Sequence, residues 1–217
     1  MTDKDLQDAV VESIRLLDRL GFVPARSGNL SVRTREGRVI VTPSGLDYAD
    51  MDADDLCLVD LDGHQLAGRL AASTELPMHL GVYRAREDVR CIVHTHARFS
   101  TVLACLGQAI PPIHYMLATI SPDAIIPLAP YATYGTEELA SGVAGALGAD
   151  RGGCLLANHG MLAVGADTVQ AVDRTIVLEE VAAVYYHAVV AGTPNVLGAE
   201  QVAEVATKIT SYGQRKR

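Results

Sequence analysis

The chain has 217 residues, of which 49% are hydrophobic, 20% are charged and 5% are aromatic, and its formal net charge is −8. This length and composition predict a single folded domain, residues 1–217, with a substantial core. The acidic balance argues against a nucleic-acid or anionic-membrane partner, and no stretch is apolar enough to span a bilayer.

Hydrophobic periodicity predicts intermingled helices and strands along the chain. A first amphipathic helix runs from about Leu6 to Leu20 and stops at Gly21, as a C-terminal glycine would require. Strands are expected at residues 30–32, 39–42, 56–60, 91–93, 125–128, 154–157 and 161–164, with a hairpin turn at Asp62-Gly63. Further helices are expected at residues 75–86, 99–106, after Thr136, at 168–191 and at 199–211. The absence of strict βαβ alternation favours an α/β fold with a mainly antiparallel sheet and helices on its faces.

The cysteines and the N-terminus indicate a cytoplasmic protein. The first twenty residues lack the apolar core of a secretory signal. The four cysteines are widely separated and lie mostly in apolar runs, which fits buried, reduced thiols rather than a disulfide framework or a thiolate zinc site. They are Cys57, Cys91, Cys105 and Cys154.

The lysines argue against one mechanism. They are Lys4, Lys208 and Lys216, all close to the termini. Schiff-base catalysis needs a lysine whose ammonium group is desolvated in a pocket. A lysine-dependent mechanism is therefore not expected.

Two histidines follow the buried strand at 91–93. Because strand side chains alternate between faces, His94 and His96 project to the same side if the strand continues, so one metal ion can accept both. The pair alone fits ordinary strand-end histidines equally well. His159 strengthens the metal interpretation, since it lies in a tight Asn158-His159-Gly160 turn after another apolar strand. Three imidazoles leave zinc one open position, as in a catalytic site.

The other histidines have weaker claims to a functional role. His114 is a competing candidate ligand. The remaining ones occupy turn or helix contexts that favour solvated or packed side chains, and they are His64, His79 and His187.

Glu75 comes at the start of a predicted helix, where Ser73 or Thr74 is the expected N-cap. By position alone, a capping or surface role is the ordinary interpretation of such a glutamate. The hydroxyls of Ser73 and Thr74, however, stand where a helix N-terminus binds anions. The turns at 27–29 and 42–45 also carry glycine and side-chain donors, which suit anion-binding nests. Three such segments beside a metal site indicate a phosphorylated ligand.

Several short blocks follow one another in a recognisable order over nearly the whole chain. They are residues 28–33, 42–45, 73–75, 94–96, 113–116, 129–136, 158–160 and 211–213. The glycine turns alone would be unspecific, whereas the ordered set is specific. On these blocks the chain resembles the class II aldolase and adducin family, and most of all its aldolases for L-fuculose 1-phosphate.

The resemblance implies a central, mainly antiparallel sheet with helices on both faces, assembled into a ring-shaped homotetramer with active sites at subunit interfaces. One Zn²⁺ per subunit would bind His94, His96 and His159, with Glu75 near or on the metal before substrate binds. The substrate phosphate would be held by Asn29, Ser44, Gly45, Ser73 and Thr74.

By the same resemblance, the protein would reversibly cleave a ketose 1-phosphate, of the L-fuculose 1-phosphate type, into dihydroxyacetone phosphate and a short aldehyde. Zinc would act as a Lewis acid toward an enediolate, and Glu75 would be the base. Tyr115 and Tyr212 would reach toward the neighbouring subunit's site. Tyr115 would act as an acid in the condensation direction, because a phenol with a pKa near ~10 is a poor base.

Two departures from the family pattern bear on substrate choice. Arg26 stands beside Gly28, where these aldolases often carry a small residue, and it would either add positive charge for the phosphate or block the pocket. Residues 119–122 replace a glycine-rich stretch that commonly follows the 113–116 block. Another deoxy- or methylthio-pentulose 1-phosphate is therefore an alternative substrate.

Two other functions remain as alternatives. A pentulose-5-phosphate 4-epimerase would use the same zinc and enediolate chemistry, but those enzymes look to carry an acidic residue near Tyr115, and Asp123 lies some distance further on. A non-catalytic scaffold like the adducin head would be free to lose the histidines. The presence of three candidate ligands and Glu75 favours catalysis.

Overall fold

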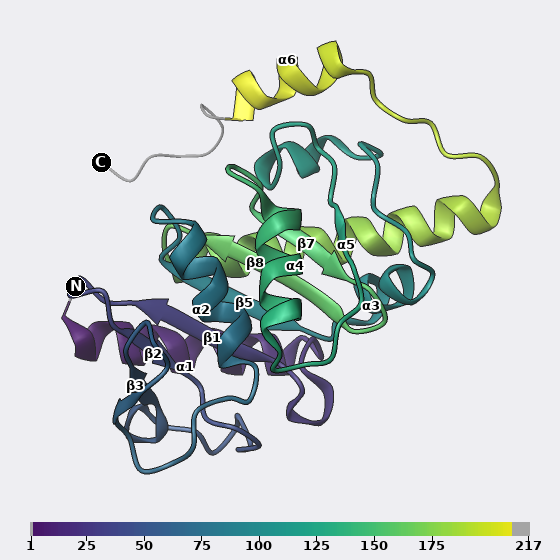
Figure 1. The fold of residues 1–217 in the computed structure, drawn as a ribbon. Coiled ribbons are helices and arrows are strands. Elements are labelled where there is room, and N and C mark those ends of the chain that lie inside the picture. The colour runs from purple at the N-terminus through teal and green to yellow at the C-terminus, as the bar shows by residue number, and fades with distance from the viewer. Residues whose placement is uncertain (1, 210–217) are drawn as a thin grey trace.

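The computed structural model describes residues 2–209, whose strands form one eight-stranded sheet with helices on both faces (Figure 1). The strands are β1 (Asn29–Arg33), β2 (Val39–Val41), β3 (Cys57–Val59), β4 (Gln65–Ala67), β5 (Cys91–Thr95), β6 (Leu128–Ala129), β7 (Gly153–Leu156) and β8 (Gly160–Gly165). Their order is β4-β3-β2-β1-β5-β8-β7-β6. Within these residues every neighbouring pair is antiparallel except β6 and β7. The predicted α/β class and mainly antiparallel sheet are confirmed.

The helices form the outer layers. They are α1 (Asp3–Arg19), α2 (Leu76–Ala85), α3 (Arg98–Cys105), α4 (Glu137–Leu147), α5 (Thr168–Ala191) and α6 (Ala199–Ile209). Helices α2 and α4 pack together on one face of the sheet, while α1, α3 and α5 cover the other (Figure 1). In the described part of the chain, no helix combines the length and apolar character that crossing a membrane requires.

Side-chain alternation along β1 and β5 assigns the functional residues to one face. Val93 belongs to the core beneath α1 and α5, whereas Ile92 packs in the core formed with α2 and α4. His94 has the same alternation as Ile92 and therefore points toward the α2 face. On the neighbouring strand, Asn29 and Ser31 lie on this face too, and Asn29 is the register partner of His94.

The N-terminus of α2 differs from the expectation that Ser73 or Thr74 caps it. Glu75 itself occupies the N-cap position, its side chain makes no capping bond, and Pro77 follows in the first turn. The Ser73 hydroxyl accepts a hydrogen bond from the Glu75 amide at 3.2 Å. The expected N-cap at Ser73 or Thr74 is therefore wrong, since the helix begins after Glu75. The Glu75 carboxylate makes no capping bond because it turns toward His94 and His159.

Three smaller expectations have mixed outcomes. The hairpin at Asp62-Gly63 is present between β3 and β4. The strand expected at 125–128 is reduced to an isolated bridge between Ile110 and Ile126, followed by β6. The last two residues of the helix expected at 199–211 lie outside the described residues.

The thiols are largely as expected. Cys57, Cys91 and Cys154 are buried and unpaired, and burial raises the pKa of each thiol. Cys105, at the end of α3, is unpaired but exposed.

Close packing of α2 on α4 holds the helix that carries Glu75. A Cβ atom added at Gly81 would lie 2.9 Å from the Cβ of Ala140, closer than side chains tolerate. The close approach of α2 to α4 therefore depends on glycine at position 81.

Replacing Gly81 by valine is expected to lower the free energy of unfolding by about 1–3 kcal/mol, because the two helices must move apart. The matched control is Gly145→Ala in α4, where an added Cβ would meet nothing within 4 Å. That change should stabilise the protein by about 0.5–1 kcal/mol. Urea denaturation of both variants measures the difference, and an unaltered midpoint for Gly81→Val would contradict the close contact.

Candidate metal centre and active site

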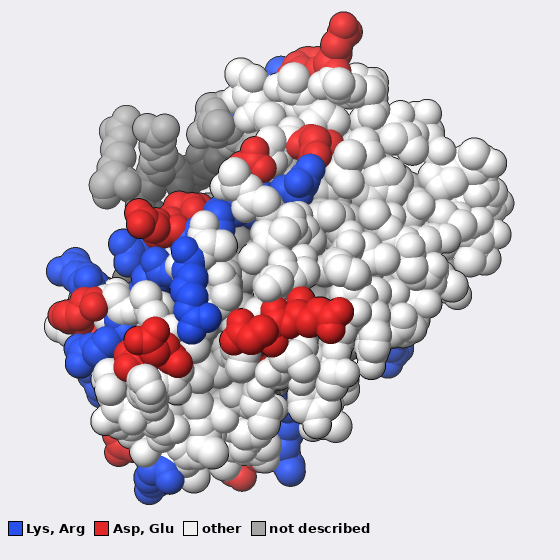
Figure 2. All heavy atoms as spheres, viewed as in Figure 1, with Lys and Arg blue, Asp and Glu red and all other residues white. Residues whose placement is uncertain are grey.

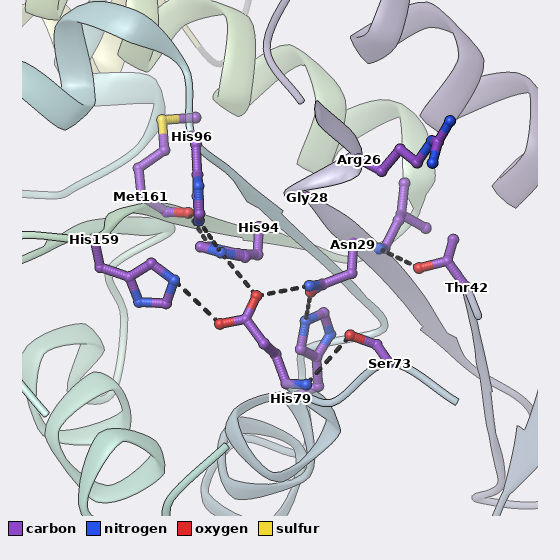
Figure 3. Close-up of polar contacts among 12 residues, drawn as sticks. Arg26, Gly28, Asn29, Thr42, Ser73, His79, His94, His96, His159 and Met161 are labelled. Atoms are coloured by element: carbon purple, nitrogen blue, oxygen red, sulfur yellow. Dashed lines mark hydrogen bonds and ion pairs between the residues drawn. The ribbon is translucent and has the colours of Figure 1, made fainter. Parts of the chain in front are cut away.

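Four side chains converge beside the end of β5 (Figure 3). His94 lies in β5, His96 follows it, His159 lies in the turn between β7 and β8, and Glu75 begins α2. The ring centroids of the histidine pairs are 4.8 to 4.9 Å apart. Each residue offers one ligand atom, and these four atoms lie within 4.8 Å of one another. The structure thus brings together all four residues expected at the metal.

The local backbone explains why His159 reaches the end of β5. Asn158 adopts a left-handed conformation with φ +55°, which turns the chain sharply between β7 and β8. A Cβ atom at Gly160 would lie 2.4 Å from the carbonyl oxygen of Thr95 and 2.9 Å from His96 Cδ2. Only glycine therefore lets this turn lie directly against the segment that carries His96.

The protonation pattern of His94 fits a metal ligand. Its Nδ1 lies 2.8 Å from the carbonyl oxygen of Met161, which can only accept, so Nδ1 carries the proton. Nε2, the ring nitrogen left available to a metal, lies 3.1 Å from both His96 Nε2 and Glu75 Oε2. Donor atoms that converge in this way can share one cation. The donor set of three imidazoles and one carboxylate fits a zinc-like divalent ion.

Electrostatics favour the deprotonated forms that bind metal. Burial alone would raise the pKa of Glu75, but the neighbouring His94 and His159 rings lower it below its usual range. Burial, assisted by His94 and His159, lowers the pKa of His96 to about 4. At neutral pH these two residues therefore present an anion and a neutral imidazole.

A pocket of about 290 Å³ opens beside this cluster. All five residues expected at the substrate phosphate line it: Asn29, Ser44, Gly45, Ser73 and Thr74. The segments at 42–45 and 71–74 are held side by side, since Ser44 N donates to Ala71 O at 3.0 Å and Ser73 N donates to Thr42 O at 3.2 Å. His96, His159 and Glu75 border the same pocket. The candidate anion and metal sites are thus contiguous.

Arg26 lies in the wall of the pocket and leaves it open. Its guanidinium is 3.3 Å from Asp47 Oδ2, in a pair whose side chains are both about half exposed. Ala25 and Arg26 both have positive φ, 53° and 65°, so the backbone turns the arginine segment over the pocket. Arg26 therefore does not close the pocket, and its guanidinium is paired with the carboxylate of Asp47.

Two further pocket residues had no role in the sequence-based expectations. Tyr134 borders the pocket and is 63% exposed. The hydroxyl oxygen of Ser27 is buried and has no hydrogen-bond partner among the described residues. Both belong to blocks or turns that the sequence pattern singled out, but neither residue type by itself indicates a function.

Tyr115, one of the two predicted tyrosines, is not part of this pocket. Tyr115 begins a short turn of 3₁₀ helix (Tyr115–Thr119), is 50% exposed, and stacks on His114 with ring centroids 4.8 Å apart. It does not line the pocket. His114 caps that turn by accepting the amide of Met116, and it is outside the metal cluster formed by the described residues. Tyr212 lies outside the described residues.

His79 is the buried neighbour that sequence reasoning did not connect to the site. It was expected to be solvated or packed, and it is fully buried with its Nε2 2.6 Å from Asn29 Oδ1. His79 lies four residues after Glu75 and therefore on the same side of the predicted helix. This spacing is the signal that could have predicted its position beside Glu75 and the strand that begins at Asn29. His64 and His187 are exposed, as expected.

Comparison with known proteins agrees with this geometry. A family model described as "Class II Aldolase and Adducin N-terminal domain" matches residues 8–186. The "5-methylthioribulose-1-phosphate/5-deoxyribulose-1-phosphate aldolase" of Rhodospirillum rubrum is 38% identical over 208 residues, which cover 96% of this chain and 92% of that protein. The "5-deoxy-D-ribulose 1-phosphate aldolase" of Bacillus thuringiensis is 33% identical over 99% of this chain and 100% of that protein.

The fold is likewise similar to that of solved aldolases. A structure of "L-fuculose 1-phosphate aldolase" superposes with a TM-score of 0.91 and 35% sequence identity, covering 97% of this chain and 98% of that one. The family match, the relatives and the shared sheet architecture all agree. The chain therefore belongs to the class II aldolase and adducin family and is, within it, a class II aldolase.

Proposed function

We propose that the protein is a zinc-dependent aldolase that reversibly cleaves a ketose 1-phosphate into dihydroxyacetone phosphate and a short aldehyde. The observation that supports this proposal is that the candidate metal site and the candidate phosphate site border the same pocket. Three imidazoles and a carboxylate converge at one end of a pocket whose other walls are turns with hydroxyl and backbone donors. L-fuculose 1-phosphate and deoxy- or methylthio-pentulose 1-phosphates fit this description.

In this proposal His94, His96 and His159 hold the metal, one Zn²⁺ per subunit, with Glu75 beside or on it. When bound, the zinc ion supplies a Lewis acid that stabilises negative charge developing on substrate oxygens. The chain's own contribution is to present neutral ring nitrogens, as the Nδ1–H of His94 bonded to Met161 supports. Glu75 and His96 border the pocket as well, so the substrate can meet the same cluster.

Glu75 is the proposed base that takes the C3 proton of dihydroxyacetone phosphate. Its carboxylate is buried, is held in the anionic form by its neighbours, and lines the pocket. Asn29 Nδ2 donates to Oε2 at 2.9 Å, which supports that oxygen in its position. Removal of the proton gives an enediolate that can add to an aldehyde, and the reverse sequence gives cleavage.

The phosphate is proposed to lie against Asn29, Ser44, Gly45, Ser73 and Thr74. Gly45 has φ +71°, so the 42–45 turn can direct successive amides into the pocket. Arg26, paired with Asp47, lines the same pocket and could bring a positive charge near the phosphate. Such a set matches a phosphate better than an uncharged sugar end.

We also propose a single-domain chain that assembles as a cytoplasmic homotetramer, with Tyr115 and Tyr212 reaching the neighbouring subunit's site. The exposure of Tyr115 supports a contact outside its own subunit. Charged side chains gather on the side of α1 and α2, whereas the side over the C-terminal half of α5 is nearly uncharged (Figure 2). That half of α5 exposes Val184, Val189 and Val190, as subunit interfaces often do.

Incubation with dihydroxyacetone phosphate and lactaldehyde, acetaldehyde or methylthioacetaldehyde tests the function and the substrate class together. At least one ketose 1-phosphate should form, a chelator should stop its formation, and zinc should restore it. Mass spectrometry identifies the adduct and elemental analysis the metal content. If no aldehyde is consumed by zinc-loaded protein, the proposed reaction is wrong.

Glu75→Gln is expected to retain zinc but to lose exchange of the C3 proton of dihydroxyacetone phosphate with solvent, by roughly 100-fold or more, because the base is absent. Proton NMR in D₂O measures that exchange. Glu180→Gln, at an exposed position of α5, is the matched control and should exchange at the wild-type rate. Unchanged exchange in Glu75→Gln would remove Glu75 from its role.

Tyr115→Phe is expected to slow carbon–carbon cleavage much more than C3 proton exchange, because its hydroxyl is assigned to the aldehyde side. Coupled assays of dihydroxyacetone phosphate release measure cleavage in parallel with the NMR exchange rate. Tyr131→Phe removes the hydroxyl of another exposed tyrosine and serves as the control. Equal slowing of both steps by Tyr115→Phe would contradict the assignment.

A further inference from the structure

A line of buried polar side chains runs from Glu75 away from the pocket, between α2 and β1. Figure 3 shows its contact between Asn29 and His79. Asn29 Nδ2 lies 2.9 Å from Glu75 Oε2, and Asn29 Oδ1 lies 2.6 Å from His79 Nε2. His79 Nδ1 lies 2.7 Å from Ser31 Oγ, which is 2.9 Å from the hydroxyl of Tyr83. None of the five residues is more than 7% exposed.

The regular spacing of side chains along helix α2 and strand β1 brings these residues together. Glu75, His79 and Tyr83 are spaced by four and so share one side of the helix. Asn29 and Ser31 are spaced by two and so share one face of the strand. The line is therefore a consequence of packing this side of α2 on this face of β1, and each contact crosses that interface.

With a neutral His79, only one direction of hydrogen bonding satisfies every member. A carboxylate accepts and never donates, so Asn29 must turn its amide nitrogen to Glu75 and its carbonyl oxygen to His79. His79 must then donate from Nε2 and accept at Nδ1, which requires the Ser31 hydroxyl as donor. The Tyr83 hydroxyl can in turn donate to Ser31 Oγ or, at 3.0 Å, to the Ser31 carbonyl oxygen.

The neutral state of His79 agrees with that direction. Burial, together with the nearby His94 ring, lowers the pKa of His79 to about 3. A doubly protonated ring would have to donate from Nδ1 to Ser31 Oγ, which would reverse that hydrogen bond. Burial likewise raises the pKa of Tyr83, so its hydroxyl keeps its proton.

We propose that His79 is a positioning residue, whose Nε2–H holds the Asn29 amide in the orientation that donates to Glu75 and thereby holds the base in place. This inference rests on the proposed role of Glu75 as the base. Without the hydrogen bond from His79, the Asn29 amide is free to rotate and place its oxygen against Glu75 Oε2, which repels the carboxylate. Asn29 also lines the pocket, so its second amide hydrogen can serve the substrate.

Two substitutions at position 79 test the roles of the two ring nitrogens separately. Glutamine places its amide near the position of Nε2 and can still donate to Asn29, whereas asparagine reaches only the position of Nδ1 and retains the interaction with Ser31. Both are polar and buried, so they share the cost of altering the core. His79→Gln should exchange the C3 proton within about threefold of the wild type, and His79→Asn should lose roughly 10- to 100-fold.

Three further readouts distinguish positioning from general damage. The zinc content should stay at the wild-type value in both variants. Because Asn29 also borders the pocket, the KM for dihydroxyacetone phosphate should rise in His79→Asn, but by a smaller factor than kcat of exchange falls. Nitrogen-15 NMR of the histidine side chains, with His79 assigned by its absence from His79→Gln, should show the Nε2–H tautomer in the wild type. That signal is independent of activity.

A second variant decides the case if His79→Asn does not fold. Ser31→Ala removes one buried oxygen, the donor to His79 Nδ1, and should lower exchange about 3- to 10-fold at unchanged zinc content. The proposal is overturned by equal exchange rates in His79→Gln and His79→Asn, by an Nδ1–H tautomer, by zinc loss in His79→Asn, or by full activity of Ser31→Ala. Absence of exchange in the wild type would instead reject the proposed function.

Discussion

The ring nitrogens of His94, His96 and His159 and the carboxylate of Glu75 approach one another to 3.1 Å at their closest. When the rings carry no proton on the facing nitrogens, such a buried arrangement is unfavourable unless a cation lies among the donors. The four residues come from three separated parts of the chain, so the sheet and α2 must be assembled before the cluster exists. The candidate metal site is thus a property of the assembled core, and a metal bound there would stabilise the folded state.

The surrounding fold is arranged so that these segments can approach. Gly160 lets the β7–β8 turn lie against the end of β5, because any side chain there would overlap the Thr95 carbonyl. Gly28 has the same role on the other side, where a Cβ atom would lie 2.8 Å from the His94 carbonyl oxygen. Glycines at positions 28 and 160 thus let the neighbouring loops pack closely around the end of β5, where the metal-binding candidates converge.

Asn29 connects the candidate sites. Its backbone pairs with His94 in the sheet, its side chain contacts Glu75 and His79, and the residue borders the pocket proposed for the phosphate. A substrate that displaced this amide would also disturb the base. In the proposed mechanism, phosphate binding and proton transfer are therefore coupled through one side chain, and the buried line behind Asn29 limits how far that side chain can move.

The sequence by itself determined the local features: nearly all helices and strands, the shared side of His94 and His96, and, through a family resemblance, the set of residues at the metal. These follow from backbone periods and turn chemistry within a few residues. The tertiary structure decided that Glu75 is an N-cap whose carboxylate leaves its helix, that His79 supports Asn29, and that Tyr115 lies away from the pocket. The first two features depend on contacts between residues far apart in the sequence, such as Asn29 with Glu75, 46 positions away, and with His79, 50 positions away, which only the packed core can specify.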